Sequence, residues 1–430
     1  DASAAGLTAT NAVALNGDFS FAGTNALTLS GAATLGANRT VTVTAGNLTL
    51  SGGVAGTGFD LTKAGTGTLT LSGANTYTGA TIVNAGTLAT TGNSRLSSTS
   101  GVTVAAGATL TLGGTETIES LTNGGTVNLN GVGANLSTGT AGGTLSGTFA
   151  GTGGLSKIGG GTLTLASAST FSYTGATAVN GGTLDLTTTA QSVSTLQITS
   201  GAITSSTGTI TVTSGGTPTF DLQGGTVSAI LAGTGVAATK SGGGLIVLSG
   251  ANTYTGLTTV NGGTLQLGRN DALLTTGSIT VAGGTFDLST YSQTTNVLKL
   301  LGGSISGTGA LNASSYSLES GSIGIALTGA AVPVNKSTNG TVVLSGANTY
   351  GGGTNILAGS MWIGSSTVLD GANAIVSGPL GTGLVTMSNG VGLGTSSATP
   401  QTLQNEVKLL GNATLGNGSS GTLTLAGDLD

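Results

Sequence analysis

Residues 61–88 read LTKAGTGTLTLSGANTYTGATIVNAGTL, and this stretch recurs three times further along the chain. The related stretches occupy residues 155–184, 238–265 and 334–361. The lysine and the tyrosine of this stretch both recur in all four copies, and the intervals between copies are similar but not equal. Self-similarity of this kind indicates a repeat protein with a long unit of about ninety residues.

Within each unit, apolar residues alternate with threonine. Residues 68–71 and 109–112 both read TLTL, and residues 209–213 read TITVT. A period of two predicts short strands with apolar side chains inside and threonine outside. Helical periodicity is missing, and the abundant Thr, Val and Ile favour strands.

Glycine-rich turns separate these strands at a regular spacing. The tripeptide Gly-Gly-Thr recurs at Gly124, Gly142, Gly181, Gly224, Gly262 and Gly283. If the longer steps each skip one turn, the period is about 20 residues, the size of one solenoid coil. Hairpins of a propeller or sandwich are alternatives, but propeller blades should keep one length, whereas the long unit varies. We therefore predict an all-β parallel β-helix, a solenoid of roughly 21 coils in a single elongated rod of about 100 Å.

The composition argues against several classes of protein. The 430 residues include 82 glycines, charged residues reach 5%, and cysteine and histidine are absent. Because those two residues supply most zinc, copper and haem ligands and the usual base of a nucleophile, we expect no metal, no cofactor and no enzyme. A formal net charge of −5 disfavours nucleic acid as a partner. No apolar run approaches the roughly 18 residues of a membrane-spanning segment.

The SGANTY stretches resemble the autotransporter-associated β-strand repeat, also called the passenger-associated transport repeat. The shared pattern is K-x-G-x-G-T-L-x-L-S-G-x-N-T-Y-x-G-x-T-x-V-x-x-G-x-L, which residues 61–88 fit best. The second copy inserts residues before Tyr173, and the fourth departs from the pattern at residues 351–353 and at Met361 and Trp362. Proteins of this family look like right-handed parallel β-helices displayed outside bacterial cells, and the right hand agrees with the crossover rule for parallel strands. The resemblance implies surface display and a scaffold, and it supplies no activity.

We expect one continuous β-helix over residues 1–430. Its approximate units are a partial one at 1–60 and further ones at 61–154, 155–237, 238–333 and 334–430. Residues 29–36 read LSGAATLG and recur as LLGNATLG at 409–416, which corresponds to an offset of four long units. Since no polar capping segment is visible at either end, we expect a segment of a longer array.

Lysine and tyrosine occupy fixed places in the repeat and are its candidate binding residues. The lysines could bind an acidic polysaccharide, but we favour solvated charges that flank a corner. The tyrosines could stack on sugars, but we favour rings that cover an open corner of the core with the hydroxyl reaching solvent. Trp362, the single tryptophan, is a candidate for an exposed binding surface. The repeat residues are Lys63, Tyr77, Lys157, Tyr173, Lys240, Tyr254, Lys336 and Tyr350.

Acidic residues test the enzyme hypothesis, because β-helical polysaccharide lyases and hydrolases group carboxylates on one face. Alternation points Asp185, Asp221 and Asp287 outward, but their spacings in the sequence do not match small whole numbers of coils. Glu116 and Glu119 are close in sequence, although they could equally decorate one loop. We therefore predict no catalytic site.

The sequence favours a non-enzymatic, extracellular structural protein of the bacterial cell surface. We expect a β-helical stalk or fibre that supports adhesion, aggregation or matrix assembly. Low charge and exposed Thr, Ser and Asn suit self-association, either end to end or lateral, and surface glycans are further candidate partners. The alternative is a β-helix that binds or cleaves carbohydrate.

Overall fold

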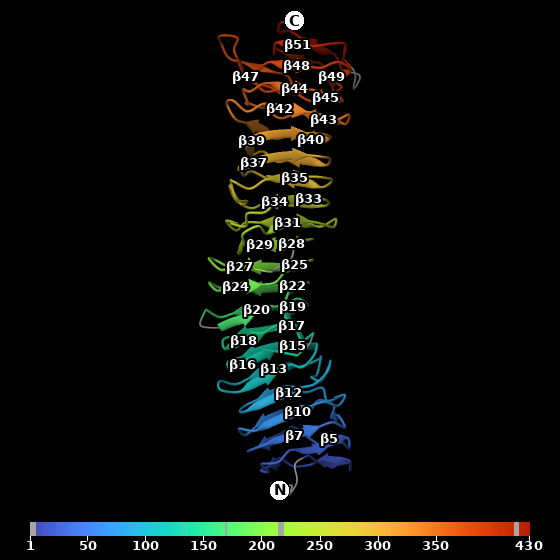
Figure 1. The fold of residues 1–430 in the computed structure, drawn as a ribbon, viewed down its shortest axis with the longest axis vertical. Helices are drawn as coiled ribbons and strands as arrows, with labels where there is room; N and C mark the ends of the chain where they lie inside the picture. Colours follow the sequence, from blue (N-terminus) through green and yellow to red (C-terminus); the bar gives the residue numbers. More distant parts are fainter. Residues whose placement is uncertain (1–5, 132, 168–169, 214–218, 417–420) are drawn as a thin grey trace. The chain divides into compact units, whose positions relative to one another are not determined.

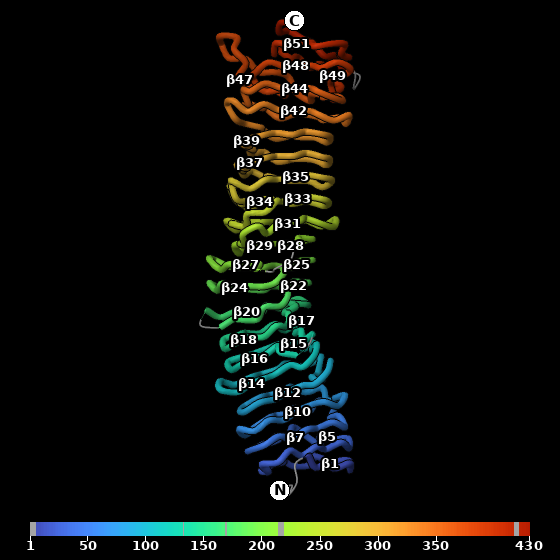
Figure 2. Tube along the Cα trace, viewed as in Figure 1, coloured from blue at the N-terminus to red at the C-terminus, as the bar shows by residue number. Residues whose placement is uncertain are grey.

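The computed structural model describes residues 6–131, 133–167, 170–213, 219–416 and 421–430. The chain forms two compact units. Unit 1 comprises Asp1–Pro218 and Ser228–Ile230, and unit 2 comprises Thr219–Val227 and Leu231–Asp430. Within each unit the chain winds through stacked coils of short strands (Figure 1), and the described residues contain no helix. Figure 2 shows that, in each unit, the backbone advances coil by coil along the sequence.

Unit 1 contains two long parallel ladders and several short corner strands. The first ladder is a nine-stranded sheet of β1 (Leu7–Ala9), β4 (Leu27–Leu29), β7 (Asn47–Leu50), β10 (Thr68–Leu71), β12 (Thr87–Thr90), β14 (Thr109–Thr111), β16 (Thr126–Leu129), β18 (Thr148–Gly151) and β21 (Thr170–Tyr173). The second contains β3 (Phe19–Phe21), β6 (Arg39–Val43), β9 (Leu61–Ala64), β11 (Thr81–Val83), β13 (Gly101–Val104), β15 (Glu116–Asn123), β17 (Asn135–Leu145), β19 (Gly154–Lys157), β20 (Thr162–Leu165), β22 (Thr177–Val179), β23 (Thr183–Asp185), β25 (Leu196–Ile198) and β26 (Ala202–Thr204). The corner strands are β2 (Val13–Leu15), β5 (Ala33–Leu35), β8 (Val54–Ala55), β24 (Ala190–Val193) and β27 (Thr209–Val212).

Unit 2 repeats this arrangement. One ladder contains β28 (Thr219–Leu222), β31 (Ala237–Lys240), β33 (Thr258–Val260), β35 (Ile279–Val281), β37 (Gln293–Leu300), β39 (Ala310–Leu318), β42 (Val334–Lys336), β44 (Thr354–Ile356), β48 (Val385–Met387) and β51 (Val407–Leu409). The other contains β29 (Gly225–Val227), β32 (Leu245–Leu248), β34 (Thr264–Leu267), β36 (Thr285–Asp287), β38 (Ser304–Ser306), β40 (Gly321–Ile323), β43 (Thr341–Leu344), β45 (Ser360–Ile363), β49 (Val391–Thr395) and β52 (Ala413–Leu415). The remaining strands are β41 (Ala326–Thr328), β46 (Val368–Leu369), β47 (Ile375–Ser377), β50 (Gln401–Leu403), β53 (Leu423–Leu425) and β30 (Ile230–Ala232), which contains residues of both units.

Strand pairing gives the length of one coil. Leu61 of β9 pairs with Thr81 of β11, and Thr81 pairs with Val102 of β13, so the chain returns to the same register once per coil. The described strand pairs are parallel, except for β46 with β47. A chain that stacks parallel strands with a period of about 20 residues is a β-solenoid, and the predicted fold class and coil length are confirmed.

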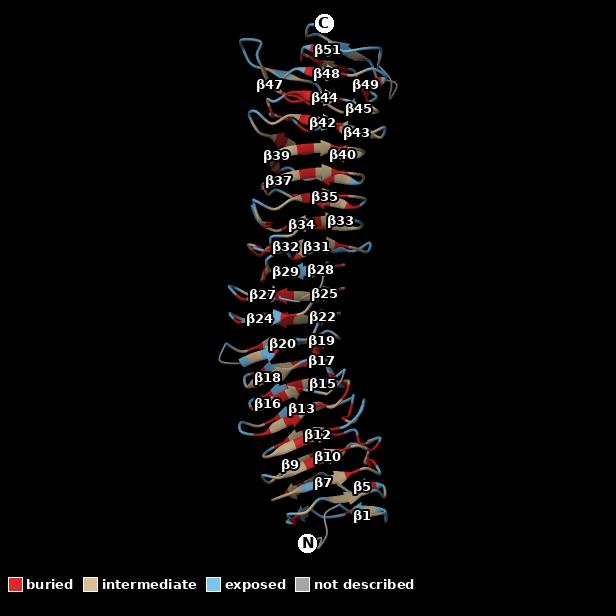
Figure 3. Ribbon diagram, viewed as in Figure 1, coloured by how far each residue is buried: buried red, intermediate tan, exposed pale blue. Residues whose placement is uncertain are grey.

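The core lies inside the coils, where most strands alternate buried residues with less buried ones (Figure 3). Leu69 pairs with Leu48 on one side and Leu88 on the other, and all three side chains are fully buried. The next residue, Thr70, lies on the outer face between Thr49 and Ala89. Burial of each leucine contributes roughly 1.5–3 kcal/mol, so a continuous inner column stabilises the stack. The predicted placement of leucine inside and threonine outside is confirmed.

One of the predicted turns lies inside a strand. Five of the six Gly-Gly-Thr turns begin in bends between strands, whereas Gly142 lies within β17. This strand pairs with β19 through residues 135–138 and with β20 through residues 143–145. The backbone changes direction between these two pairings, at Gly142 with φ 74° and Gly143 with φ 145°. Glycine therefore still makes the corner, but hydrogen bonding continues through it.

Strands β46 and β47 form an antiparallel hairpin that departs from the coil. Val368 and Val376 in this hairpin are 52% and 50% exposed. Asp370 follows the first strand, and its carboxylate accepts hydrogen bonds from the N–H groups of Ala372 and Ala374 at 2.8 and 2.9 Å. The hairpin is a loop insertion within the fourth repeat.

Candidate functional site

Each repeat lysine is the last or next-to-last residue of a strand, and its side chain points into the coil. In β9, Leu61 and Lys63 are both buried while Thr62 between them is half-buried, so the strand alternation places the lysine on the core side. The same pattern holds in β19, β31 and β42. The four lysine residues have an exposed fraction of 0%. The prediction that Lys63, Lys157, Lys240 and Lys336 are solvated charges is therefore wrong.

Main-chain carbonyl groups surround each buried ammonium group. Lys63 Nζ donates hydrogen bonds to the carbonyl oxygens of Ala64 at 2.9 Å and Gly65 at 2.8 Å, in its own turn, and of Ala85 at 3.1 Å, in the next coil. Gly65 has φ 78°, a conformation that turns its carbonyl toward the lysine and favours glycine. We call this arrangement the lysine cage.

The other three repeats build the same cage with small differences. Lys157 Nζ donates to Ile158 and Gly159 of its own turn and to Gly139 of the preceding coil. Lys240 Nζ donates to Ser241 and Gly242. Lys336 Nζ donates to Thr338 and to Ala358 of the next coil. Because partial negative charge on carbonyl oxygens replaces water, burial of the ammonium group becomes tolerable.

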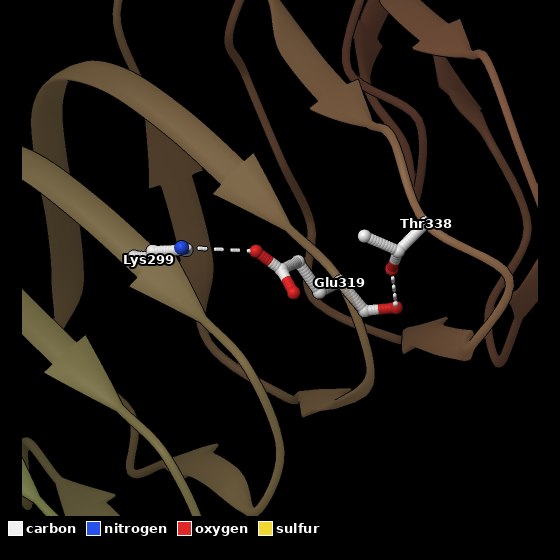
Figure 4. Close-up of polar contacts among 3 residues, drawn as sticks. All are labelled: Lys299, Glu319 and Thr338. Atoms are coloured by element: carbon white, nitrogen blue, oxygen red, sulfur yellow. Dashed lines mark hydrogen bonds and ion pairs between the residues drawn. The ribbon is translucent and has the colours of Figure 1, made fainter.

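Burial is the main influence on the pKa of the caged lysines. It lowers the pKa of Lys63 to about 8, and it also lowers the pKa of the other three. Carboxylates near the later cages, those of Glu119, Asp221 and Glu319, oppose this effect at Lys157, Lys240 and Lys336 respectively. Glu319 itself forms a salt bridge of 3.0 Å with Lys299, and its main-chain carbonyl accepts a hydrogen bond from Thr338 (Figure 4).

The repeat tyrosines fill another corner of the same coils. Each hydroxyl is bonded to the hydroxyl of the threonine four residues later, at 2.6–2.7 Å, and each ring is at most 2% exposed. Burial raises the pKa of Tyr77, Tyr173 and Tyr254 to about 12 and raises the pKa of Tyr350 further. The rings cover the core as expected, but the hydroxyls do not reach solvent. The expectation failed because the Thr81, Thr177, Thr258 and Thr354 hydroxyls point inward at the start of the following strand.

An asparagine that sequence reasoning missed lies two residues before the tyrosine; it is half-buried in the first repeat and buried at Asn252 and Asn348. Asn75 Oδ1 accepts a hydrogen bond of 2.7 Å from Val54 N–H in the coil before, and Asn75 Nδ2 donates one of 2.7 Å to Arg95 O in the coil after. Asn252 and Asn348 make the same two contacts in their own repeats. The side-chain amide thus continues the inter-coil hydrogen bonding across a corner where the backbone cannot. Its recurrence in SGANTY was the available signal.

The candidate carboxylates do not form a common site. Asp185, Asp221 and Asp287 are half-buried on the outer face, as alternation predicted. Asp185 pairs with Thr164 and Thr204, and Asp287 accepts a hydrogen bond of 2.7 Å from Gln266. Asp221 accepts hydrogen bonds from the side chains of Ser241 and Gln223 at 2.7 and 2.8 Å.

Glu116 and Glu119 both lie in β15 and not in a loop. Glu116 is fully buried, and its carboxylate accepts hydrogen bonds from the main-chain N–H groups of Arg95 and Leu96 at 2.8 and 3.0 Å. Burial raises the pKa of this carboxyl group, and the same hydrogen bonds oppose that rise. Glu119 is half-buried and binds Thr140 and Ala141 of the next coil. The two groups point to opposite sides of the strand and cannot act together on one substrate.

Trp362 lies in β45 and is half-buried on the outer face, between Val343 and Gly394 of the neighbouring strands. It is therefore neither a core residue nor a freely exposed one. The described residues contain no cluster of three or more acidic side chains that could hold a metal ion. They also include no helix with the length and apolar character needed to cross a membrane.

The fold and its corners define the class of protein: a parallel β-solenoid repeat protein whose long unit has a caged lysine, a buried tyrosine and, in three of its four copies, an inter-coil asparagine. The family model described as passenger-associated-transport-repeat matches the chain four times, at residues 61–89, 155–186, 239–267 and 335–363. The chain is thus built on passenger-associated transport repeats, and the resemblance seen in the SGANTY stretches is confirmed.

A curated relative extends the similarity beyond these four stretches. The chain is 35% identical over 378 residues to the adhesin BmaC autotransporter of Brucella suis biovar 1 (strain 1330). The match covers 73% of this chain and 11% of the relative, so the chain corresponds to a small part of that protein's length. No solved structure matches the chain.

Proposed function

We propose that the chain is a non-enzymatic part of the surface-exposed passenger of an autotransporter-type protein. In this proposal, the β-solenoid is a stalk that projects from the bacterial cell and supports adhesion. The single observation that carries the proposal is the fourfold match to the passenger-associated transport repeat within a parallel β-solenoid. The similarity to an autotransporter adhesin supports it.

The chemistry of the corners supports a structural role for the repeat. Lysine, tyrosine and asparagine are the most reactive or polar residues that the repeat supplies, and each makes its hydrogen bonds inside the coil. A ligand at the surface would meet threonine, serine and the turn backbone instead of these groups. The polysaccharide-cleaving alternative needs adjacent carboxylates, whereas Asp185, Asp221 and Asp287 pair along the strands with Thr164, Thr239 and Gln266.

The test is surface display of the chain in a laboratory bacterium, between an export signal and an autotransporter translocation domain. We expect added protease to remove the chain from intact cells, and we expect displaying cells to adhere to surfaces better than cells with the translocation domain alone. Protection from protease together with unchanged adhesion would overturn the proposal.

Self-association through the outer faces is a further part of this proposal. Charged residues make up only 5% of the chain, and the outer positions of the strands are mainly threonine, serine and asparagine, so repulsion between copies is weak. We expect the weight-average sedimentation coefficient of the purified chain to increase with concentration over about a hundredfold range. A constant monomer value over that range would restrict the function to a spacer.

A further inference from the structure

A hollow of about 240 Å³ opens in unit 1 beside the first repeat corner. Its walls come from residues 75–78, from Ser94 and residues 96–99, and from Thr117, which lie on successive coils. The lining contains no charged side chain. Pockets for drug-sized ligands begin at roughly 300 Å³, so this hollow has room for a single ring and not for a long chain.

Hydrogen bonds of Asn75 and Glu116 hold the main chain around the hollow in place, and they do not involve the hydroxyl groups that line its surface. Asn75 bonds the coils on either side, at Val54 and Arg95. The buried carboxylate of Glu116 holds the N–H groups of Arg95 and Leu96. The loop that forms one wall is therefore anchored at both faces, which preorganises the hollow for a ligand.

The surface of the hollow presents hydroxyl groups above an apolar floor. Thr76, Ser94, Ser98 and Thr117 are exposed, and their hydroxyls make no hydrogen bond to the described part of the chain. The floor includes Leu96 and the ring of Tyr77, which are 4% and 2% exposed. A hydroxyl can both donate and accept, as the hydroxyls of a sugar do, while the floor suits the C–H face of a sugar ring.

A second corner with the same framework has a different lining. In unit 2, Asn252 takes the place of Asn75 and bonds Leu231 and Ala272, while Gln293 replaces Glu116 and accepts a hydrogen bond from Leu273 N–H. There, Leu274 stands at the position of Ser97 and Asp271 at that of Ser94. The corner thus folds with either an isobutyl group or a hydroxymethyl group at this point, so the fold itself does not require the hydroxyl lining of the first hollow.

We propose that this hollow is a binding site for one neutral sugar residue, held by the hydroxyls of Thr76, Ser94, Ser98 and Thr117. The inference concerns this chain's own surface and does not rest on the proposed place of the chain in a surface passenger. Because the site is small, open to solvent and uncharged, its affinity for a free monosaccharide is weak, with a dissociation constant on the order of 1 mM.

Saturation-transfer NMR on the full chain tests this site with the methyl glycosides of glucose, galactose and mannose as probes. We expect saturation transfer to at least one glycoside. Ser97→Leu, which copies the residue of the unit 2 corner, should reduce the transfer at least about tenfold because the side chain enters the hollow. Ser98→Ala removes one hydroxyl without filling the hollow and should weaken binding severalfold.

Thr275→Ala at the corresponding place in unit 2 is the matched control and should leave the signal unchanged. Circular dichroism of each variant shows whether the fold is kept. Absence of transfer to all three glycosides, or equal transfer in the native chain and in folded Ser97→Leu and Ser98→Ala variants, would overturn the proposal.

Discussion

A lysine buried without a salt bridge usually costs stability, and each of the four repeats holds one. The salt bridges among the described residues, Lys299 with Glu319 and Lys408 with Asp430, do not involve the caged lysines. In the lysine cage, the ammonium group donates hydrogen bonds to carbonyl oxygens of a turn. Within the described part of the chain, most of these oxygens accept no hydrogen bond from a main-chain N–H group. Each lysine is thus a hydrogen-bond donor that the backbone lacks, which explains why a charged residue occupies a core position.

The cages and the tyrosine corners predict a maximum in stability at alkaline pH. The folded-state pKa of Lys63 is about 8, below the ordinary value of 10.5, so the unfolded chain binds more protons between these values and the free energy of unfolding rises with pH. The buried tyrosines have a folded-state pKa of about 12, above the ordinary 10.0, so stability falls above pH 10. Urea unfolding followed by circular dichroism should show a rise from about pH 8 to about pH 10 and then a fall. A steady decrease from pH 8 upward would contradict this balance.

Glycine is required at the position two residues after the repeat tyrosine. A Cβ on Gly79 would lie 2.2 Å from the carbonyl carbon and oxygen of Phe59 in the preceding coil, and the backbone cannot yield there without separating the coils. Gly79→Ala should therefore destabilise the chain by about 2–4 kcal/mol, in the range of overpacked or strained sites. Gly160→Ala is the control, because a Cβ at that position meets no atom within 4 Å. Thermal unfolding of both variants measures the difference, and equal melting temperatures would refute the close approach.

The period-two alternation of apolar residues and threonine predicted correctly which strand residues face the core. The same alternation also predicts the side of the strand on which each lysine lies, but the prediction for the lysines did not use it. Reading Leu61-Thr62-Lys63 with a period of two places Lys63 on the same face as Leu61, which is what the structure shows. The usual preference of lysine for solvent misled the interpretation, because the carbonyl oxygens that compensate its burial lie partly on another coil, far away in the sequence. The hydroxyl partner of Tyr77 was accessible in principle, since a threonine recurs four residues after the tyrosine in every copy.

At the scale of the strand, inner and outer positions should differ in how well they tolerate a charged side chain. Leu69 in β10 is fully buried between Leu48 and Leu88, so Leu69→Asp puts a carboxylate into the apolar column and should unfold the surrounding coils. Thr70→Asp changes the adjacent outer position, where water can solvate the charge, and should alter the free energy of unfolding by less than about 1 kcal/mol. Chemical denaturation compares the two variants. Similar losses at both positions would contradict the assignment of faces.

The hairpin of β46 and β47 is the element that the repeat pattern did not predict. Its turn reads Asp370-Gly371-Ala372-Asn373-Ala374 between the apolar pairs Val368-Leu369 and Ile375-Val376, and an Asp-Gly sequence flanked by such residues is a hairpin signal. The signal was hidden because glycine-containing turns also occur at the ordinary corners of this chain. Strand β45, immediately before the hairpin, keeps the parallel register, so the insertion does not disturb the ladder.

At the scale of the whole molecule, stability should depend on contacts between neighbouring coils, as in other solenoids. Lys63→Met removes the donor for the carbonyls of Ala64, Gly65 and Ala85, and leaving such groups without partners should cost about 2–4 kcal/mol. Hydrogen exchange followed by mass spectrometry should show faster exchange at residues 39–90, the coils that meet at this cage, and unchanged exchange at residues 239–267 and 335–363. Uniformly faster exchange over all four repeats would show that the chain responds as one cooperative body.

The central claim is that the repeat lysines are buried and bind main-chain carbonyl groups in the lysine cages. Amine labelling of the folded chain tests this claim most directly. The six lysines divide into four caged residues and two exposed ones, Lys299 and Lys408, whose side chains are 43% and 47% exposed. An amine-reactive ester attacks the neutral amine, so the lowered pKa of an accessible Lys63 would increase its reactivity, and only burial can protect it. Peptide mass spectrometry should find Lys299 and Lys408 labelled about a hundredfold faster than the caged lysines in the folded chain, with similar rates for all six after denaturation. Labelling of Lys63, Lys157, Lys240 and Lys336 in the folded chain as fast as that of Lys299 would contradict the account.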